Sequence, residues 1–111
     1  MIIEMNLQPG PFKAIESGLK DIEMRLYDDR RKKIKVGDII MFTNTETDEK
    51  MFVEILNLYR FKDFKELYNN FDKNRLGYKE DEIANPSDME KYYTKELINQ
   101  FGVLGIEIQV I

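Results

Sequence analysis

The sequence predicts an α+β fold, in which five or six mostly antiparallel strands form a small β-barrel with two or three flanking helices. The chain has 111 residues, the size of a single globular domain. Several segments alternate apolar and polar residues as half-buried strands do, and segments with helical spacing interrupt them early in the chain and before its last strand. No repeat or linker divides the sequence, so we expect one domain over residues 1–111.

The first third of the chain predicts a strand, a short helix and a second strand. The opening segment, "MIIEMNL", is typical of a strand. A helix is expected over Pro11–Ser17, because proline favours a first helical turn and Gly18 suits a left-handed stop. The next segment, "DIEMRLY", predicts a strand with one face in the core and one polar face. Its apolar positions are Ile22, Met24 and Leu26.

The middle of the chain predicts a hairpin. Gly37 and Asp38 form a turn signal before the strand "IIMFTNT". The polar segment "TETDEK" then separates this strand from a second one, "MFVEILNLYRF", as a hairpin loop does.

Two more helices and a closing strand are expected in the last part. Helical spacing connects five apolar residues, and a polar loop over 72–77 ends that helix; the five are Phe61, Phe64, Leu67, Tyr68 and Phe71. A longer helix is expected over Ser87–Gln100, because Ser87 and Glu90 fit a capping box and Gly102 can end a helix. The closing strand is "VLGIEIQVI".

The composition restricts the chemistry that the chain can perform. There is no cysteine and no histidine, which excludes disulfides, thiolate nucleophiles, histidine bases and the usual zinc sites. We therefore predict no cofactor and no metal. The net charge of −4 argues against binding of nucleic acid by overall charge. No apolar run approaches the length of about 20 residues that spans a bilayer, so we expect a cytoplasmic protein without a membrane partner.

One motif carries a resemblance to a known family. Gly18, Lys20, Glu23 and Arg25 form the pattern G-x-K-x-x-E-x-R directly after the short helix, Gly37-Asp38 leads into the next strand, and the chain closes with G-V-x-x-I-x-I. This arrangement resembles the ASCH domain family, named for activating signal cointegrator homology, whose β-barrel is related to the PUA fold. The resemblance covers nearly the whole chain. It implies a PUA-like barrel and association with RNA or nucleotides; some bacterial members are amidohydrolases acting on acetylcytidine, and others are ribonucleases.

The residues of this motif also suggest a binding site by themselves. Glu23 and Arg25 are two apart on the polar face of a strand, where the arginine could clamp a phosphate or a carboxylate. Lys20 is out of phase with them, so a shared site requires a bend just after Gly18. The alternative is a surface ion pair beside a solvated lysine, worth at most about 1 kcal/mol. The family resemblance favours the site.

Further candidate binding residues follow the motif. Five basic residues lie between residues 30 and 35, and only two acidic residues, Asp28 and Asp29, lie beside them. This basic segment is expected either to contact RNA phosphates at the rim of a cleft or to be an ordinary solvated loop. The bases assigned to binding are Arg30, Arg31 and Lys33. Tyr27 is four residues after Glu23, so in a regular strand both side chains lie on the same face. Tyr27 is therefore the aromatic residue expected to stack on a base. Tyr92 and Tyr93 are a second candidate pair.

Two classes of function follow, and binding ranks first. In the first, a cleft lined by the G-x-K-x-x-E-x-R segment holds an RNA end or a nucleoside, with Lys20 and Arg25 at phosphate and Glu23 accepting hydrogen bonds from base amines. In the second, the chain is a metal-independent hydrolase of RNA or a modified nucleoside, with Glu23 as base and Lys20 stabilising the oxyanion. The acetylcytidine branch of the family carries a lysine, a threonine three residues later and a distant glutamate. Here Lys20 matches and Glu23 replaces the threonine, while Glu80 and Glu82 are both candidates for the distant residue.

Overall fold

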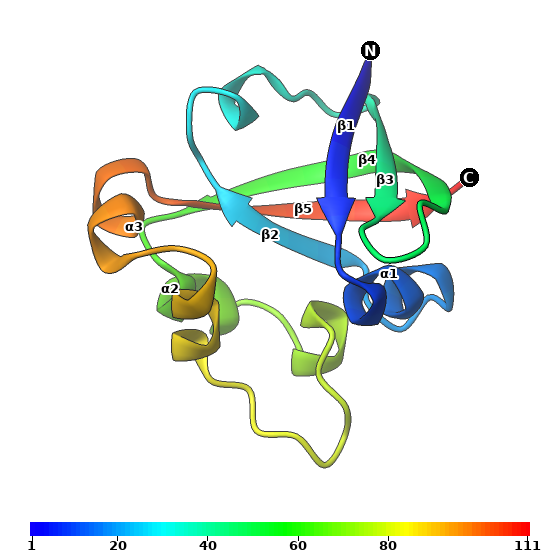
Figure 1. Cartoon of the computed structure of the whole chain (residues 1–111). Coiled ribbons are helices and arrows are strands. Elements are labelled where there is room, and N and C mark those ends of the chain that lie inside the picture. The colour runs from blue at the N-terminus through cyan, green and yellow to red at the C-terminus, as the bar shows by residue number, and fades with distance from the viewer.

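The computed structural model describes residues 1–111. Five strands alternate with three α-helices and three 3₁₀ helices (Figure 1). In chain order they are β1 (Ile2–Leu7), α1 (Pro9–Glu16), β2 (Ile22–Leu26), η1 (Arg31–Lys33), β3 (Ile39–Asn44), β4 (Lys50–Phe61), α2 (Phe64–Tyr68), η2 (Lys73–Leu76), η3 (Pro86–Lys91), α3 (Lys95–Phe101) and β5 (Val103–Val110).

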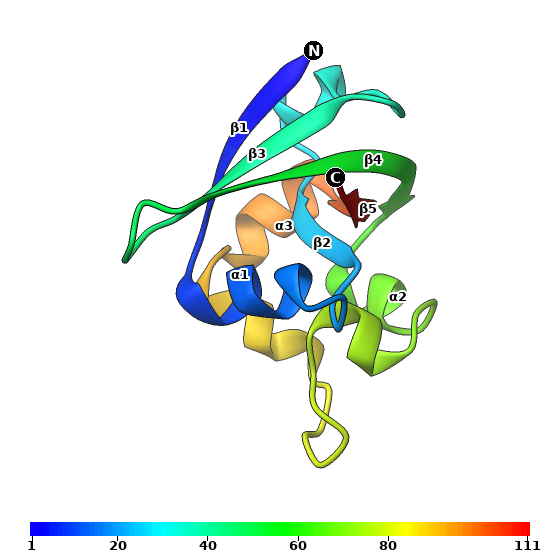
Figure 2. The ribbon, with the colours of Figure 1, turned by 90° about the vertical axis from the view of Figure 1, so that its right-hand side faces the viewer.

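All five strands belong to one curled sheet with the order β1-β3-β4-β5-β2 (Figures 1 and 2). The β1–β3 pair is parallel and the other three pairs are antiparallel. The first part of β4 pairs with β3 and most of its length with β5, and the register shifts between Ile55 and Asn57, as at a β-bulge. The predicted α+β fold with a small, mostly antiparallel barrel is confirmed: the sheet is a half-barrel with β1 and β2 as its edges.

The core has two parts, one on each face of the sheet. The inner part lies within the half-barrel, where α1 contributes Phe12 and Ile15 and packs against β1 and β3. The outer part lies between β2 and the helical segments that follow β4. In β5, Leu104 belongs to the inner part and its neighbour Val103 to the outer part, as the alternation of a strand requires.

This division explains an unexpected feature of β2. Its apolar residues face the helical segments, as Met24 does, so its polar face turns into the half-barrel rather than toward solvent. Glu23 on that face is only 3% exposed. The strand therefore has the predicted apolar and polar faces, and both are covered, which argues against the alternative of a solvated surface ion pair.

The two later helices are shorter than the sequence predicted. Phe61 is still paired with β5, and α2 begins only after Asp63, whose side chain accepts a hydrogen bond from the Glu66 backbone N–H. The expected helix over Ser87–Gln100 is two separate helices, η3 and α3. The backbone of Thr94 is extended and its hydroxyl accepts from the backbone N–H of the third residue of α3, so a new helix begins there.

The predicted capping box of Ser87 and Glu90 is not formed. Instead, the side chain of Asn85 accepts from the backbone N–H of Ser87 at 3.0 Å. The helix over Pro11–Ser17 was better placed, since α1 spans Pro9–Glu16. None of the helices is long and apolar enough to cross a membrane.

Candidate ligand-binding cleft

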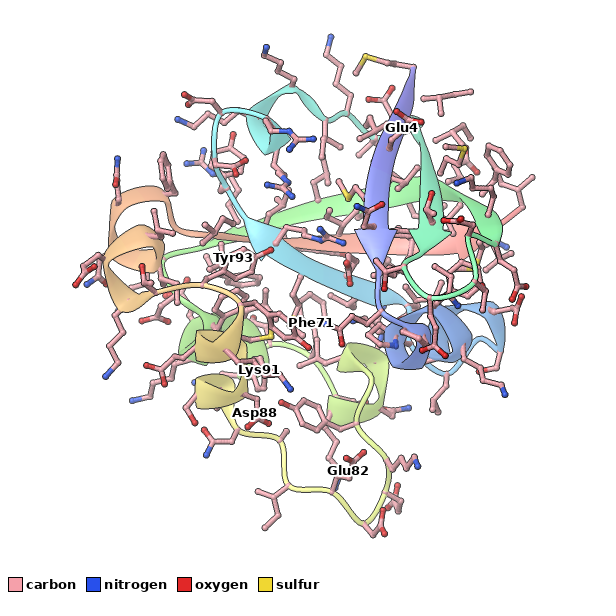
Figure 3. All side chains as sticks on the ribbon, in the orientation of Figure 1. Glu4, Phe71, Glu82, Asp88, Lys91 and Tyr93 are labelled. Atoms are coloured by element: carbon pink, nitrogen blue, oxygen red, sulfur yellow. The ribbon has the colours of Figure 1, made fainter.

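A cleft of about 500 Å³ opens between the two edge strands of the sheet and the helical segments after β4. One wall comes from the end of β1, the start of α1 and the stretch from Lys20 into β2, and the opposite wall comes from α2, η2 and η3. Figure 3 shows the labelled residues Asp88, Lys91 and Tyr93 on the segment that faces β2. A hollow of this size can hold a small organic molecule.

The G-x-K-x-x-E-x-R residues meet at the first wall. Glu23 lies in the middle, with Oε1 3.0 Å from Lys20 Nζ and Oε2 2.8 Å from Arg25 Nη2. Arg25 Nε also donates to Glu23 Oε2, at 2.9 Å. Lys20 is 7% exposed, so all three charges are largely removed from water. Spacing along a strand therefore placed Glu23 and Arg25 together as expected, and Lys20 joins them.

Lys20 reaches the cleft because it precedes β2 instead of lying in it. Gly18 adopts a left-handed backbone conformation with φ +84°, and the backbone N–H of Lys20 donates to the carbonyl of Ala14 at 3.0 Å. This turn is the bend that the out-of-phase position required. Gly77 lines the Lys20 stem: a Cβ at this glycine would stand 3.1 Å from Lys20 Cδ.

Arg25 also connects the two edges of the half-barrel. Its Nη2 donates to the backbone carbonyl of Asn6 at 2.8 Å, which joins β2 to β1 where no strand pairing does. Burial lowers the pKa of Arg25, but the Glu23 carboxylate outweighs burial and raises it. The guanidinium therefore stays charged while it bridges the strands.

The environment keeps Glu23 ionised. Burial by itself raises the pKa of this carboxyl, but the charges of Lys20 and Arg25 outweigh burial and hold the pKa below its usual value. A carboxylate with a lowered pKa is a weak proton acceptor near neutral pH. The arrangement is suited to orienting two cations and poorly suited to abstracting a proton.

Hydrogen-bond capacity remains on both cations after their contacts with Glu23 and Asn6. A guanidinium has five N–H donors and an ammonium has three. The hydrogen bonds of Arg25 use Nε and Nη2, and Tyr93 on the opposite wall also interacts with this guanidinium, while the ammonium of Lys20 contacts one oxygen of Glu23. This wall of the cleft can therefore donate to a phosphate, carboxylate or carbonyl oxygen of a ligand.

The opposite wall is aromatic. Tyr92 and Tyr93, the second candidate pair from the sequence, both line the cleft. Tyr93 stacks on Phe64 with ring centroids 6.1 Å apart and an interplanar angle of 14°, and Lys91 Nζ lies 5.2 Å from the ring centre of Tyr92. Tyr92 is 48% exposed, so its ring is open to contact by a flat group.

Tyr27 does not line the cleft. It follows the last residue of β2, packs against the inner core and is covered by the guanidinium of Arg60 at 4.0 Å from the ring centre. The alternation of side chains that predicted Tyr27 beside Glu23 does not hold past Leu26, because the strand ends there.

The basic segment does not line the cleft. Arg31 Nη1 pairs with Asp28 Oδ2 at 2.7 Å, while Arg30 and Lys33 are exposed. Burial raises the pKa of Tyr93. Of the two candidate distant glutamates, Glu82 lines the cleft and Glu80 does not.

Sequence reasoning missed several residues of the opposite wall. Tyr68, Tyr78 and Asp88 line the cleft but received no functional assignment. Helical spacing made Tyr68 a core residue, and Tyr78 lies in a polar stretch without periodicity. The one signal available was the number of tyrosines, rather than phenylalanines, over 68–93, since a buried tyrosine needs a partner for its hydroxyl.

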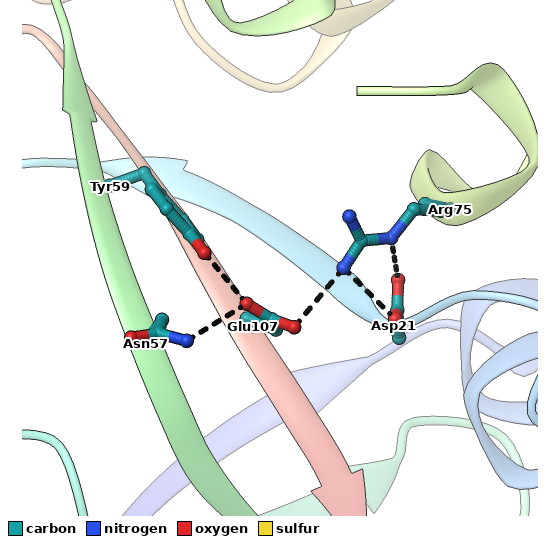
Figure 4. A network of polar contacts seen from close by, with 5 residues as sticks. All are labelled: Asp21, Asn57, Tyr59, Arg75 and Glu107. Carbon is teal, nitrogen blue, oxygen red and sulfur yellow. Dashed lines mark hydrogen bonds and ion pairs between the residues drawn. The ribbon is translucent and has the colours of Figure 1, made fainter. Parts of the chain in front are cut away.

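A second polar network lies on the other face of β2 (Figure 4). Arg75 Nε donates to Asp21 Oδ1 at 2.9 Å, and Arg75 Nη2 donates to Asp21 Oδ2 and Glu107 Oε2. Glu107 Oε1 accepts from Tyr59 at 2.8 Å and from Asn57 at 3.2 Å. This outer network attaches η2 to the sheet and belongs to no large cleft. The structure holds no group of three or more acidic, histidine or cysteine side chains arranged for a metal.

Comparison with known proteins finds one matching family model and several similar solved structures. The family model described as the ASCH domain matches residues 5–111. A crystal structure described as hypothetical protein PH0355 is 31% identical, with a TM-score of 0.81 and coverage of 100% of both chains. The solution structure of protein PF0455 from Pyrococcus furiosus is 28% identical, with a TM-score of 0.72, over 100% of this chain and 98% of that one.

A more distant similarity shows the fold alone. A mutant of the ASCH protein from Zymomonas mobilis has 15% identity and a TM-score of 0.69, over 97% of this chain and 68% of that one. The comparison with curated proteins finds no match.

Proposed function

We propose that this chain, which belongs to the ASCH domain family, is an RNA- or nucleotide-binding module whose ligand lies in the cleft between β2 and η3. The observation that carries the proposal is the buried cluster of Lys20, Glu23 and Arg25, whose cations retain free donors at the cleft wall. A net positive wall opposite exposed aromatic rings suits a nucleotide, which combines an anionic phosphate with a flat base.

Burial of three charges supports a binding role over a purely structural one. Moving charges out of water costs several kcal/mol for each ion, and hydrophobic residues of similar size often stabilise a protein as well as a buried ion pair does. The bridge from Arg25 to Asn6 accounts for one cation. The ammonium of Lys20 pairs with Glu23 and has no hydrogen bond to β1, so its burial at the cleft wall is better explained by a ligand that needs its charge.

Each member of the cluster has a distinct role in this proposal. Lys20 and Arg25 contact the phosphate or a carbonyl oxygen of the ligand. Glu23 orients them, because both of its oxygens already face cations and it is almost inaccessible. The surroundings of Glu23 therefore favour a role in orienting the two cations over direct hydrogen bonding to base amines.

The basic segment extends the proposed surface beyond the cleft. Arg30 and Lys33 are exposed, and their segment follows β2 directly in the chain. In a longer RNA these bases contact phosphates that follow the bound nucleotide. Each such contact adds to the salt dependence of binding, so a mononucleotide should show a weaker salt dependence than an oligonucleotide.

A hydrolase is the less favoured alternative. It requires Glu23 to act as a base, but its pKa is held low by Lys20 and Arg25. No hydroxyl side chain stands three residues after Lys20 to serve as nucleophile. The surroundings of Glu23 therefore support binding rather than turnover.

The test is titration of short single-stranded oligonucleotides and nucleoside monophosphates against Arg25→Ala and Arg25→Lys. Loss of a charge-assisted contact worth about 1.5–3 kcal/mol predicts at least about tenfold weaker binding by Arg25→Ala. Arg25→Lys retains the charge and checks that weaker binding by Arg25→Ala is not caused by poor folding of that variant. The matched control is Lys65→Ala, which removes an exposed charge on α2 outside this cleft. Equal affinities for the wild type and both Arg25 variants, or no binding by the wild type, would refute the proposal.

A further inference from the structure

The helical wall of the cleft contains a chain of three hydrogen-bonding side chains. The hydroxyls of Tyr68 and Tyr78 lie 2.8 Å apart, and the Tyr78 hydroxyl donates to Asp88 Oδ2 at 2.7 Å. The three residues come from α2, the segment after η2, and η3, which the sequence separates but the fold brings to one wall. The chain faces the wall that carries Lys20 and Arg25.

The direction of the hydrogen bonds in this chain is fixed by the acid at its end. The Tyr78 hydroxyl also lies 3.3 Å from the backbone carbonyl of Asn85, and neither this carbonyl nor an ionised carboxylate can donate, so the single hydrogen of Tyr78 points to these acceptors, of which Asp88 is the nearer. Tyr68 must then supply the hydrogen between the two tyrosines. Burial raises the pKa of both hydroxyls, so each keeps its hydrogen at neutral pH.

This direction leaves acceptors at the cleft. The Tyr68 oxygen has given its hydrogen to Tyr78 and receives none from any other protein group. Asp88 accepts from Tyr78 through Oδ2, and its Oδ1 has no protein donor. The two walls of the cleft therefore have opposite polarity: Lys20 and Arg25 donate, whereas the Tyr68–Tyr78–Asp88 chain accepts.

From this polarity we propose that the cleft selects nucleobases with an exocyclic amino group, which donates to the Tyr68 oxygen or to Asp88. The inference rests on the proposed nucleotide-binding function and adds the part of the base that is recognised. Cytosine and adenine carry such an amino group beside a ring nitrogen that accepts, so their edge matches one accepting and one donating wall. A ligand without the amino group leaves the acceptors facing a group that cannot pair with them.

The test compares nucleotides that differ only in the amino group. The probes are cytidine 5′-monophosphate against its analogue without the 4-amino group, and adenosine 5′-monophosphate against purine riboside 5′-monophosphate, titrated by calorimetry. We expect the wild type to bind the amino-bearing member of at least one pair about tenfold more tightly. Tyr68→Phe and Asp88→Asn should reduce that preference to less than about threefold, while their affinity for the analogue stays near that of the wild type.

The control is Tyr59→Phe, which removes a hydroxyl of the outer network outside the cleft and should leave the preference intact. Binding that depends on Arg25 but shows no amino preference in either pair would overturn the inference and leave the proposed function standing. The same conclusion follows if the preference survives both Tyr68→Phe and Asp88→Asn. No binding of any of the four nucleotides by the wild type would remove both proposals.

Discussion

An arginine pairs with acidic side chains on each side of β2, Arg25 from the strand itself and Arg75 from η2, but the two networks differ in burial, in net charge and in access to the cleft. On the inner face, two cations surround one buried carboxylate, and the cations line a cleft. On the outer face, Arg75 pairs with two carboxylates and is 33% exposed. The inner network has one cation in excess, whereas the outer network has one carboxylate in excess and holds η2 against the sheet.

This difference shows what spacing in a sequence can and cannot tell. Asp21 and Glu23 are two residues apart, and each pairs with an arginine and would be read alike in the sequence. Their environments differ because Glu23 is buried between Lys20 and Arg25 at the cleft wall, while Asp21 is partly exposed where it pairs with Arg75 of η2. Burial, rather than the pairing itself, distinguishes a candidate binding site from a structural clamp.

The strongest test of the comparison removes the central carboxylate from each network. Glu23→Gln leaves Lys20 and Arg25 buried beside each other without a counter-charge, and we expect a loss of about 3–5 kcal/mol in the free energy of unfolding. Glu107→Gln should cost about 1 kcal/mol, because Glu107 is more exposed and the amide retains hydrogen-bonding capacity. Urea denaturation of both variants and the wild type measures the difference. Equal losses would mean that burial does not separate the two networks.

A second test disturbs the inner network without changing its charges. Gly77 has φ +105°, and an added Cβ would lie 3.1 Å from Lys20 Cδ. Gly77→Ala should therefore cost about 1–3 kcal/mol of stability and weaken nucleotide binding through a displaced Lys20.

Gly10→Ala is the matched control for this change, since it lies in α1 with no atom within 4 Å of the added Cβ. It should leave stability unchanged or raise it by up to about 1 kcal/mol. Thermal denaturation together with nucleotide titration separates the two variants. A neutral Gly77→Ala would show that the Lys20 stem can shift freely.

The sequence predicted most of the fold because half-buried strands show a regular alternation of apolar and polar residues. The five strands lie where alternation placed them, and the bend at Gly18 that Lys20 required is present. Helices were predicted less well, because Thr94 restarts a helix within what looked like one apolar stripe. Local spacing records periodicity but does not say where a capping side chain interrupts it.

The site was predicted only where its residues are adjacent in sequence. Lys20, Glu23 and Arg25 fall within six residues, so a motif could reveal them. The Tyr68–Tyr78–Asp88 chain spans 21 residues and three separate segments, and only the packing of η3 against α2 brings its members together. Tyr27 was assigned to the cleft by the alternation of side chains along a strand, but β2 ends one residue earlier and Tyr27 packs beneath Arg60.

The pH dependence of stability offers a third comparison. The folded pKa of Glu23 is lowered, so this residue contributes stability that is complete above its unfolded pKa near 4.5 and is lost as the pH falls through the folded value. Wild type should therefore lose stability below about pH 4.5 more steeply than Glu23→Gln, which has no such group to protonate. Urea unfolding between pH 3 and 7 measures both curves, with linkage giving the proton uptake. Parallel curves would show that Glu23 has the same pKa in the folded and unfolded states.

The smallest effect is expected when the outer network loses its arginine. Arg75→Ala removes the contacts to Asp21 and Glu107 and the packing of the guanidinium over Phe71, at 5.4 Å from its ring centre. Because these groups are partly solvated, the loss of stability should be about 1 kcal/mol or less. Nucleotide affinity should stay within about twofold of the wild type, since Arg75 lies across β2 from the cleft and does not line it. Arg25→Ala, by contrast, should cause a large loss of nucleotide affinity if only the inner network belongs to the binding site. A strong effect of Arg75→Ala on binding, measured by the same titration, would mean that the two faces of β2 act as one site.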